Sequence, residues 1–305
     1  MQLPTHVKLV DVGPRDGLQN EKQPVPAEVK IELIERLQDA GVRNIEATSF
    51  VSPKWVPQMA DNAQVMRGIR RKPGVRHAVL IPNMQGLQAA LAAPRAQWPD
   101  EIVVFGSASE AFSRKNINCS IAESIERFRP VVAAAHDQGL RVRGVMSCTV
   151  GCPYEGEVAP ERVGLLAKMF KDIGVQEIAV ADTIGVGTPL KVQRALEATL
   201  AHFAPQDVSG HYHDTYGQAL ANTLASLELG VAQFDTSVAG LGGCPYAKGA
   251  TGNVATEDVV YMLHGMGIET GIDLDKLIDA GVYISQALGR EPQSRASKAI
   301  RNKRV

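Results

Sequence analysis

The chain has 305 residues and a formal net charge of −1, with 45% hydrophobic and 5% aromatic residues. This length suits one large α/β domain whose core is built from Val, Ile, Leu and Ala rather than from aromatic rings. The near-neutral charge argues against a nucleic-acid partner, and the lack of an apolar run of about 18 residues argues against a membrane span.

Short apolar, β-branched segments recur along the chain and predict buried parallel strands. These segments are residues 7–12, 44–50, 77–81, 101–106, 141–148, 177–181, 208–213 and 233–238. Helical periodicity fills most of the gaps between them, often with a glycine directly after the last periodic residue. The predicted helices are residues 27–40, 56–70, 84–92, 120–138, 159–173, 189–203, 218–229 and 256–266.

The alternation of about eight strand–helix units in roughly 260 residues is typical of a (β/α)₈ TIM barrel. We predict a single domain over residues 1–305, with the barrel at about 5–266 and a helical C-terminal extension at about 267–305. An open doubly wound sheet is the alternative, but it needs a glycine-rich dinucleotide turn after the first strand. The chain has Gly-Pro-Arg-Asp-Gly at that point, and Pro245 stands where the later glycine-rich segment needs its last glycine.

Polar residues gather where the predicted strands end, which is the side of such a barrel that carries the active site. Two of them, His211 and His213, are two residues apart on one strand and therefore point to the same side. They are either structural histidines or, together with Asp16, the ligands of a metal ion. The strand-end set is Arg15, Asp16, Glu46, Ser49, Asp182, His211, His213, Cys244 and Asn253.

A site made of one Asp, two His and one Asn oxygen suits Mg²⁺ or Mn²⁺, with Co²⁺ or Zn²⁺ as alternatives. Arg15 either pairs with a neighbouring carboxylate or stabilises an oxyanion, since its charge is permanent and its donors form a fork. Glu46 and Asp182 interrupt apolar strands, and a buried carboxylate needs a cation or hydrogen bonds. Glu46 either forms a salt bridge to Arg15 or to a lysine, or it has a direct chemical role; both alternatives stay open.

Cys244 lies in a glycine-rich loop, where a thiol can enter a closed site as an acid or base. The alternative is that it packs as a small apolar side chain. Cys119, Cys148 and Cys152 are expected to pack as free thiols, as in a reducing cytosol.

Several long motifs resemble the 3-hydroxy-3-methylglutaryl-CoA lyase family, a group of divalent-metal TIM-barrel enzymes related to the isopropylmalate and homocitrate synthases. The resemblance covers nearly the whole chain up to about residue 290 and rests on residues 12–22, 48–59, 115–120, 152–156, 211–222 and 237–253. The Gly-Gly-Cys-Pro loop around Cys244 is absent from those synthases, which argues for cleavage rather than condensation. The resemblance implies that the metal ligands are Asp16, His211, His213 and Asn253.

The resemblance also implies that Cys244 is the catalytic thiol and that Arg15 contacts the substrate. Glu46 and Asp182 match further active-site positions. Asn116 is a candidate acyl-CoA contact by resemblance only, and Ser49 at the end of the second strand is a further candidate for substrate binding. A proton acceptor, His211 or Asp16, would complete the cleavage of 3-hydroxy-3-methylglutaryl-CoA to acetyl-CoA and acetoacetate.

Two alternative functions stay open. One is cleavage of a longer branched substrate such as 3-hydroxy-3-isohexenylglutaryl-CoA, and the other is a non-catalytic barrel that only binds a metal or CoA. Animal members carry an organelle-targeting leader and a C-terminal cysteine that this sequence lacks, so we expect a cytoplasmic, bacterial-type enzyme and a homodimer. The basic tail after Arg290 is expected to be a solvated or frayed terminus rather than a phosphate site, and residues 94–100 have no predicted function.

Overall fold

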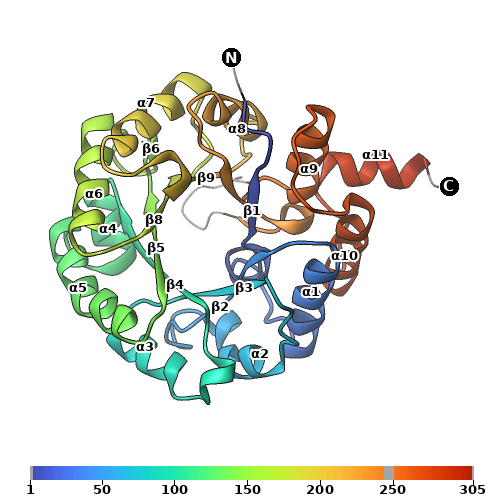
Figure 1. Ribbon diagram of the computed structural model, residues 1–305, viewed down its shortest axis with the longest axis horizontal. Helices are drawn as coiled ribbons and strands as arrows, with labels where there is room; N and C mark the ends of the chain where they lie inside the picture. The colour runs from blue at the N-terminus through green and yellow to red at the C-terminus, as the bar shows by residue number, and fades with distance from the viewer. Residues whose placement is uncertain (1–2, 244–250, 304–305) are drawn as a thin grey trace.

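The computed structural model describes residues 3–243 and 251–303. Eight parallel strands close into a barrel in the order β1-β10-β9-β8-β5-β4-β3-β2, and the helices surround them (Figure 1). The predicted (β/α)₈ fold is therefore confirmed. The barrel strands are β1 (Lys8–Asp11), β2 (Asn44–Ser49), β3 (Arg76–Leu80), β4 (Glu101–Ser107), β5 (Arg141–Ser147), β8 (Glu177–Asp182), β9 (Val208–Tyr212) and β10 (Gln233–Thr236).

The helices turn their apolar faces toward the barrel, and the main hydrophobic core fills the layer between helices and strands. None of the helices in the described part of the chain is long and apolar enough to cross a membrane. A short hairpin, β6 (Gly151–Cys152) and β7 (Gly156–Glu157), follows β5. The helices are α1 (Ala27–Asp39), α2 (Asn62–Gly68), α3 (Met84–Leu91), α4 (Glu110–Ile117), α5 (Ile121–Asp137), α6 (Pro160–Asp172), α7 (Pro189–Leu200), α8 (Ala219–Leu227), α9 (Thr256–Gly265), α10 (Leu274–Ala287) and α11 (Arg295–Lys303).

Two helix predictions need correction. The helix predicted at 56–70 begins only at Asn62, because Pro57 starts a separate 3₁₀ turn, Pro57–Met59, ahead of it. Helix α4 was not predicted, since only Phe112 and Ser113 are buried in it and the apolar period is short. Its start is capped by Ser109, whose hydroxyl accepts the N–H of Phe112 at 3.0 Å.

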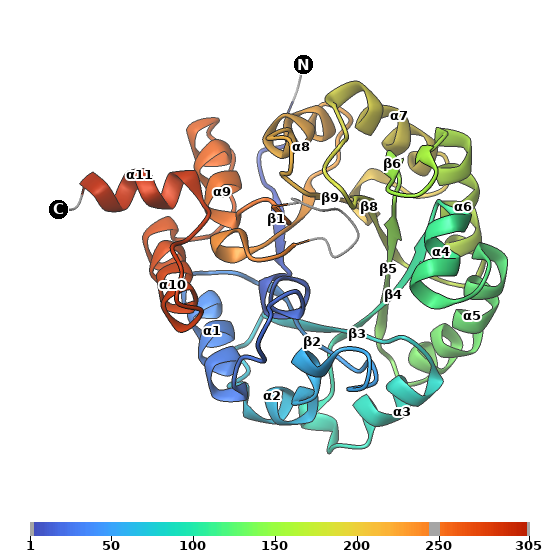
Figure 2. The same cartoon turned by 180° about the vertical axis from the view of Figure 1, so that it is seen from behind.

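The C-terminal extension packs on the outside of the barrel. Helix α10 lies against α1, where the guanidinium of Arg36 sits 4.5 Å from the ring centre of Tyr283. The predicted helical extension is confirmed, because residues 295–303 form helix α11, which projects beside α9 (Figure 2); the basic tail is solvated over these residues but is not frayed. Its first turn is fixed by Asp258, whose carboxylate accepts the N–H of Ala296 and the hydroxyl of Ser294, both at 2.7 Å.

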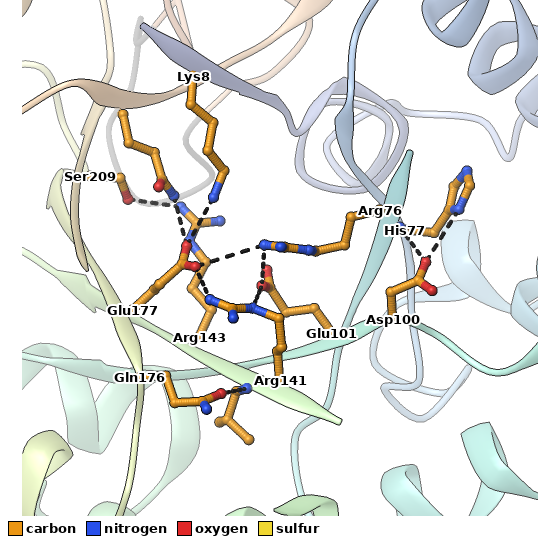
Figure 3. A network of polar contacts seen from close by, with 12 residues as sticks. Lys8, Arg76, His77, Asp100, Glu101, Arg141, Arg143, Gln176, Glu177 and Ser209 are labelled. Carbon is orange, nitrogen blue, oxygen red and sulfur yellow. Dashed lines mark hydrogen bonds and ion pairs between the residues drawn. The ribbon is translucent and has the colours of Figure 1, made fainter. Parts of the chain in front are cut away.

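The interior of the barrel begins with a layer of charged side chains at the N-terminal ends of the strands (Figure 3). Glu177 accepts hydrogen bonds from Lys8 and Gln233, both at 3.1 Å, and from Arg141. Glu101 pairs with Arg76 at 3.3 Å and with Arg141 at 3.7 Å. We call these six residues, Lys8, Arg76, Glu101, Arg141, Glu177 and Gln233, the lower network.

Residues 94–100 pack beside this end of the barrel. They contain a 3₁₀ turn, Arg95–Gln97, and the indole of Trp98 donates to the carbonyl of Ala93 at 2.7 Å. Asp100 accepts the backbone N–H of His77 in β3 at 2.8 Å and pairs with Arg71 at 3.1 Å. The stretch therefore joins the start of β4 to β3.

Candidate active site

The turn after β1 brings Arg15 and Asp16 over the C-terminal mouth of the barrel. The carbonyl of Val12 accepts the backbone N–H of Arg15 at 3.2 Å and of Asp16 at 2.7 Å, which closes a tight turn over Gly13–Gly17. Glycine is required at Gly17, because a Cβ atom there would lie 2.6 Å from the Cβ of Leu241. The sequence of this turn thus fixes both side chains and joins the turn to the loop after β10.

Arg15 is buried and bonded to two carboxylates. Its Nε donates to Oε1 of Glu46 at 2.6 Å, and its Nη1 donates to Oδ1 of Asp16 at 2.9 Å. Of the roles left open for Glu46, the salt bridge to Arg15 is therefore present in the structure, and a direct chemical role stays a prediction. The planar fork of donors holds the first turn against β2 and keeps a permanent positive charge at the mouth.

Asp16, His211 and His213 converge at the same mouth. Each offers one ligand atom, and these atoms all lie within 4.8 Å of one another, as the spacing of the two histidines predicts. Burial would raise the pKa of Asp16, but the charges of Arg15 and the two histidines lower it to about 2. Burial, together with the charge of His211, lowers the pKa of His213 to about 4, so its imidazole is neutral at pH 7 with a free lone pair.

Asn253 lies beside this cluster. Its Nδ2 donates to Oδ2 of Asp16 at 2.7 Å, and its backbone forms a β-bridge with His213. Two backbone segments are in close contact here, since a Cβ on Gly252 would lie 2.5 Å from the carbonyl carbon of Gly242. Cys244 follows two residues after Gly242 and lies outside the described residues.

Sequence reasoning missed Asp235. Its carboxylate accepts from Nδ1 of His211, at 3.0 Å from Oδ2, because the β9–β10 register places the two residues opposite each other. Its other oxygen is bonded to Nη2 of Arg143, a fully buried side chain of β5. The available signal was the polar residue at every second position of the eighth predicted strand, Gln233, Asp235 and Ser237, which marks an inward-facing polar side.

Two further carboxylates that the sequence did not single out hold the loop after β10. Asp11 accepts the backbone N–H of Val238 at 3.0 Å and the hydroxyl of Thr256 at 2.8 Å. Glu257 accepts the N–H of Ala239 with both oxygens, at 2.9 and 3.0 Å. Burial raises the pKa of Asp11 to about 7 and that of Glu257 to about 8.

Three other predicted site residues lie outside the metal cluster; two of them, Ser49 and Asp182, bond to backbone N–H groups a few residues further along the chain. Ser49 accepts the N–H of Val51 at 3.2 Å. Asp182 accepts the N–H of Gly187 at 2.7 Å and of Val186 at 3.1 Å, and burial raises its pKa to about 6. Asn116 is exposed on α4. Their roles toward a substrate stay predictions.

The residues at the mouth fit a divalent cation. Asp16, Glu46 and Asp235 supply three carboxylates, whereas Arg15 and Arg143 supply two guanidinium groups, so the carboxylates outnumber the guanidinium groups by one. The buried Nδ1 of His213 has no hydrogen-bond partner among the described residues. Clustered lone pairs with excess negative charge are the usual surroundings of a metal ion in a barrel mouth.

Comparison with known proteins gives one consistent result. A family model described as HMGL-like matches residues 6–284. The cytoplasmic 3-hydroxy-3-methylglutaryl-CoA lyase of Danio rerio is 57% identical over 301 residues, which is 99% of this chain and 89% of the relative. A Pseudomonas aeruginosa protein named 3-hydroxy-3-isohexenylglutaryl-CoA/hydroxy-methylglutaryl-CoA lyase is 55% identical over 300 residues, or 98% of this chain and 99% of the relative.

Solved structures are similar over the whole chain. The crystal structure of hydroxymethylglutaryl-CoA lyase from Pseudomonas aeruginosa has a TM-score of 0.96 at 55% identity and covers 99% of this chain and 100% of that one. A lyase from Acinetobacter baumannii in complex with coenzyme A and 3-methylmalate has a TM-score of 0.93 at 36% identity, covering 100% of this chain and 98% of that one.

Proposed function

The chain belongs to the HMGL-like family, and we propose that it cleaves 3-hydroxy-3-methylglutaryl-CoA to acetyl-CoA and acetoacetate. The observation that carries the proposal is the convergence of Asp16, His211 and His213 beside the buried guanidinium of Arg15. The likeness to full-length lyases supports the same reaction. The lyase bound to coenzyme A supports an acyl-CoA as substrate.

We propose that Asp16, His211, His213 and Asn253 hold a divalent cation. Mg²⁺ or Mn²⁺ suits a set that mixes oxygen with imidazole ligands, and Co²⁺ or Zn²⁺ are the alternatives. Such an ion lowers the pKa of a bound hydroxyl and so eases loss of the proton from the tertiary alcohol of the substrate. The low pKa of Asp16 keeps this ligand ionised at every pH at which the enzyme would work.

The remaining steps fall to the protein. The hydroxyl proton must pass to a base beside the cation, for which His211 and Asp16 are the two candidates; Nε2 of His211 can accept it only while that nitrogen is not bound to the cation. The C2–C3 bond then breaks, the alkoxide becomes the ketone of acetoacetate, and the electron pair stays on the acetyl-CoA enolate. Arg15 stabilises the negative oxygen, with Glu46 keeping the guanidinium in place.

Protonation of the enolate carbon yields acetyl-CoA, and we assign this proton to the thiol of Cys244. The assignment is supported by the chain order, since Cys244 follows Gly242 by two residues, and a Cβ on Gly242 would lie 2.9 Å from Nδ2 of Asn253. We predict that Cys244→Ala loses about 10²–10⁴-fold in turnover, the usual contribution of one acid–base group. Steady-state kcat measures the loss.

The control for this variant is Cys119→Ala, which removes another thiol and should keep kcat. Metal binding should be unchanged in both variants. If Cys244→Ala turned over at the wild-type rate, its role as the proton donor would be wrong.

A longer branched substrate is the second candidate function, because a relative of 55% identity is named as a lyase for both 3-hydroxy-3-isohexenylglutaryl-CoA and hydroxymethylglutaryl-CoA. The ratio of kcat/KM for the two substrates decides between one substrate and both. A cytoplasmic location and a homodimer also stay our predictions, and sedimentation measures the latter.

The experiment that tests the proposed function uses the full chain stripped of metal with a chelator. We expect no acetoacetate from 3-hydroxy-3-methylglutaryl-CoA in this state, and recovery on addition of Mg²⁺ or Mn²⁺. A folded, metal-loaded protein that produces no acetoacetate, and none of the longer ketone from the isohexenyl substrate, would overturn the lyase assignment.

A further inference from the structure

Arg143 is a fully buried cation inside the barrel that bonds to the two strands behind the metal cluster. It lies on β5 with 0% exposure, and Nη2 donates to Oδ1 of Asp235 and, at 3.0 Å, to the hydroxyl of Ser209. Ser209 and His211 lie on the same side of β9, two residues apart. Arg143 therefore contacts both β9, which carries His211, and β10, which carries Asp235; Figure 3 shows it beside the lower network.

Asp235 connects this cation to the metal cluster. A carboxylate accepts hydrogen bonds but does not donate them, so the contact at 3.0 Å requires the proton of the imidazole on Nδ1 of His211. The lone pair of the ring is then on Nε2, the nitrogen left to face Asp16 and His213. An unpaired carboxylate at 2% exposure would be costly, and Arg143 is the cation that neutralises it.

The two histidines are held in different ways. His211 has a carboxylate behind its ring, whereas the buried Nδ1 of His213 has no hydrogen-bond partner among the described residues and its position follows from the β-bridge with Asn253. A change at Arg143 should therefore alter the orientation of His211 but not that of His213.

We propose that Arg143 and Asp235 are positioning residues, which hold His211 in the tautomer and orientation that a divalent cation needs and so set the metal affinity of the site. The inference rests on the proposed function, because it takes His211 as a metal ligand. Neither residue is assigned a contact with the substrate. Changes in partners behind a ligating histidine typically alter metal affinity or activity about 10–100-fold.

The test measures Mn²⁺ binding to metal-stripped full-length protein by electron paramagnetic resonance. We expect Asp235→Asn and Arg143→Met each to raise the Kd for Mn²⁺ by about 10–100-fold. The activation constant for Mn²⁺ should rise in parallel. Ser209→Ala removes one contact of Arg143 without removing a charge, and it should raise the Kd by only about threefold.

Arg141→Met is the matched control. Arg141 is an arginine two residues earlier on the same strand, but it bonds to Glu177 and not to Asp235. This variant should lower the melting temperature and leave the Kd for Mn²⁺ unchanged. If Arg141→Met weakened Mn²⁺ binding as much as Arg143→Met, the effect would be a general loss of packing and the proposal would be wrong.

Nitrogen NMR of ¹⁵N-histidine-labelled protein gives a readout without metal, and a His211→Gln variant assigns the signals. Wild type should show the Nδ1–H tautomer of His211, and Asp235→Asn should show a mixture. Unchanged Mn²⁺ affinity and an unchanged tautomer in Asp235→Asn would overturn the inference. A wild-type protein that binds no Mn²⁺ would overturn the proposed metal site itself, which is a separate result.

Discussion

The two mouths of the barrel treat buried charge in opposite ways. In the lower network the carboxylates of Glu101 and Glu177 are each shared among two or more cations, so every carboxylate there is paired within the network. At the other mouth, Asp16, His211 and His213 turn lone pairs toward a common point, and carboxylates outnumber guanidinium groups. The two ends of the barrel thus differ in where their polar atoms point: into ion pairs at the lower network, and toward a common point where a cation could bind at the other mouth.

Arg143 stands between the two regions. Its Nη2 bonds to Asp235 at the metal side, while the charge of Glu101 acts on it from the lower side. The largest effect is expected from changing the shape of the cation at the upper mouth. Smaller effects are expected from removing a carboxylate in the lower network or beneath the loop after β10.

Arg15→Lys should disrupt the hydrogen bonds of Arg15 to Glu46 and Asp16 at the upper mouth while keeping the positive charge. An ammonium cannot bond Glu46 and Asp16 with the planar fork of a guanidinium, so we expect kcat/KM to fall by about 10²-fold or more, on the scale of losing one oxyanion donor. Steady-state kinetics with 3-hydroxy-3-methylglutaryl-CoA measures the loss. Arg129→Lys, an exposed position on α5, is the control and should change nothing. A fully active Arg15→Lys would show that only the charge matters.

Glu177→Gln should weaken the lower mouth and spare catalysis. The change leaves Lys8 and Arg141 without their shared carboxylate, and since both cations are partly exposed we expect a loss of only about 1–3 kcal/mol in the free energy of unfolding. Denaturant titration at pH 7.5 measures it, with the exposed Glu161→Gln as control. The value of kcat should be unchanged. A large fall in kcat at normal stability would contradict the division of the barrel into a structural and a functional mouth.

The sequence predicted the upper mouth better than the network behind it. Strand ends and the two-residue spacing of His211 and His213 follow from local periodicity, and Asp16 belongs to a recognisable turn. Asp235 became part of the site only through the register between β9 and β10, and Arg143 through contact across the barrel with a residue 92 positions away. Such pairings depend on how the barrel closes, which local patterns do not encode.

The helices, too, were predicted where a local apolar period marks them and not where contacts with distant residues fix them. Residues 27–40 have a strong apolar period, and α1 formed within one residue of this prediction, whereas α10 lies within the predicted helical extension. Helix α11 lies within the predicted helical extension, but its bounds were not predicted, because it has one buried residue and its start is fixed by Asp258 from α9 rather than by its own apolar face. Cys244, which the glycine-rich loop marked as a candidate, lies outside the described residues.

Glu257 shows a third way to keep a buried carboxylate, without any cation. Neither Asp11 nor Glu257 forms an ion pair within residues 3–243 and 251–303; both accept N–H or O–H groups near the loop after β10. Burial raises the pKa of Glu257 from 4.5 to about 8. Because the folded-state pKa lies above the unfolded one, the stability that the protonated group provides is complete below pH 4.5 and is lost as the pH rises through 8.

Glu257→Gln keeps an oxygen that can accept the N–H of Ala239 and removes the titration. We expect the melting temperature of the wild type to fall between pH 5.5 and 8.5. The melting temperature of the variant should fall less, and the difference between the two falls should be roughly 3–6 °C, since a protein of this size shifts by a few degrees per kcal/mol. Asp258→Asn is not a suitable control, because Asp258 fixes α11, whereas Glu161→Gln is exposed and should follow the wild-type curve. Parallel curves for wild type and Glu257→Gln would mean that Glu257 is already ionised in the folded state, held by the N–H of Ala239 alone.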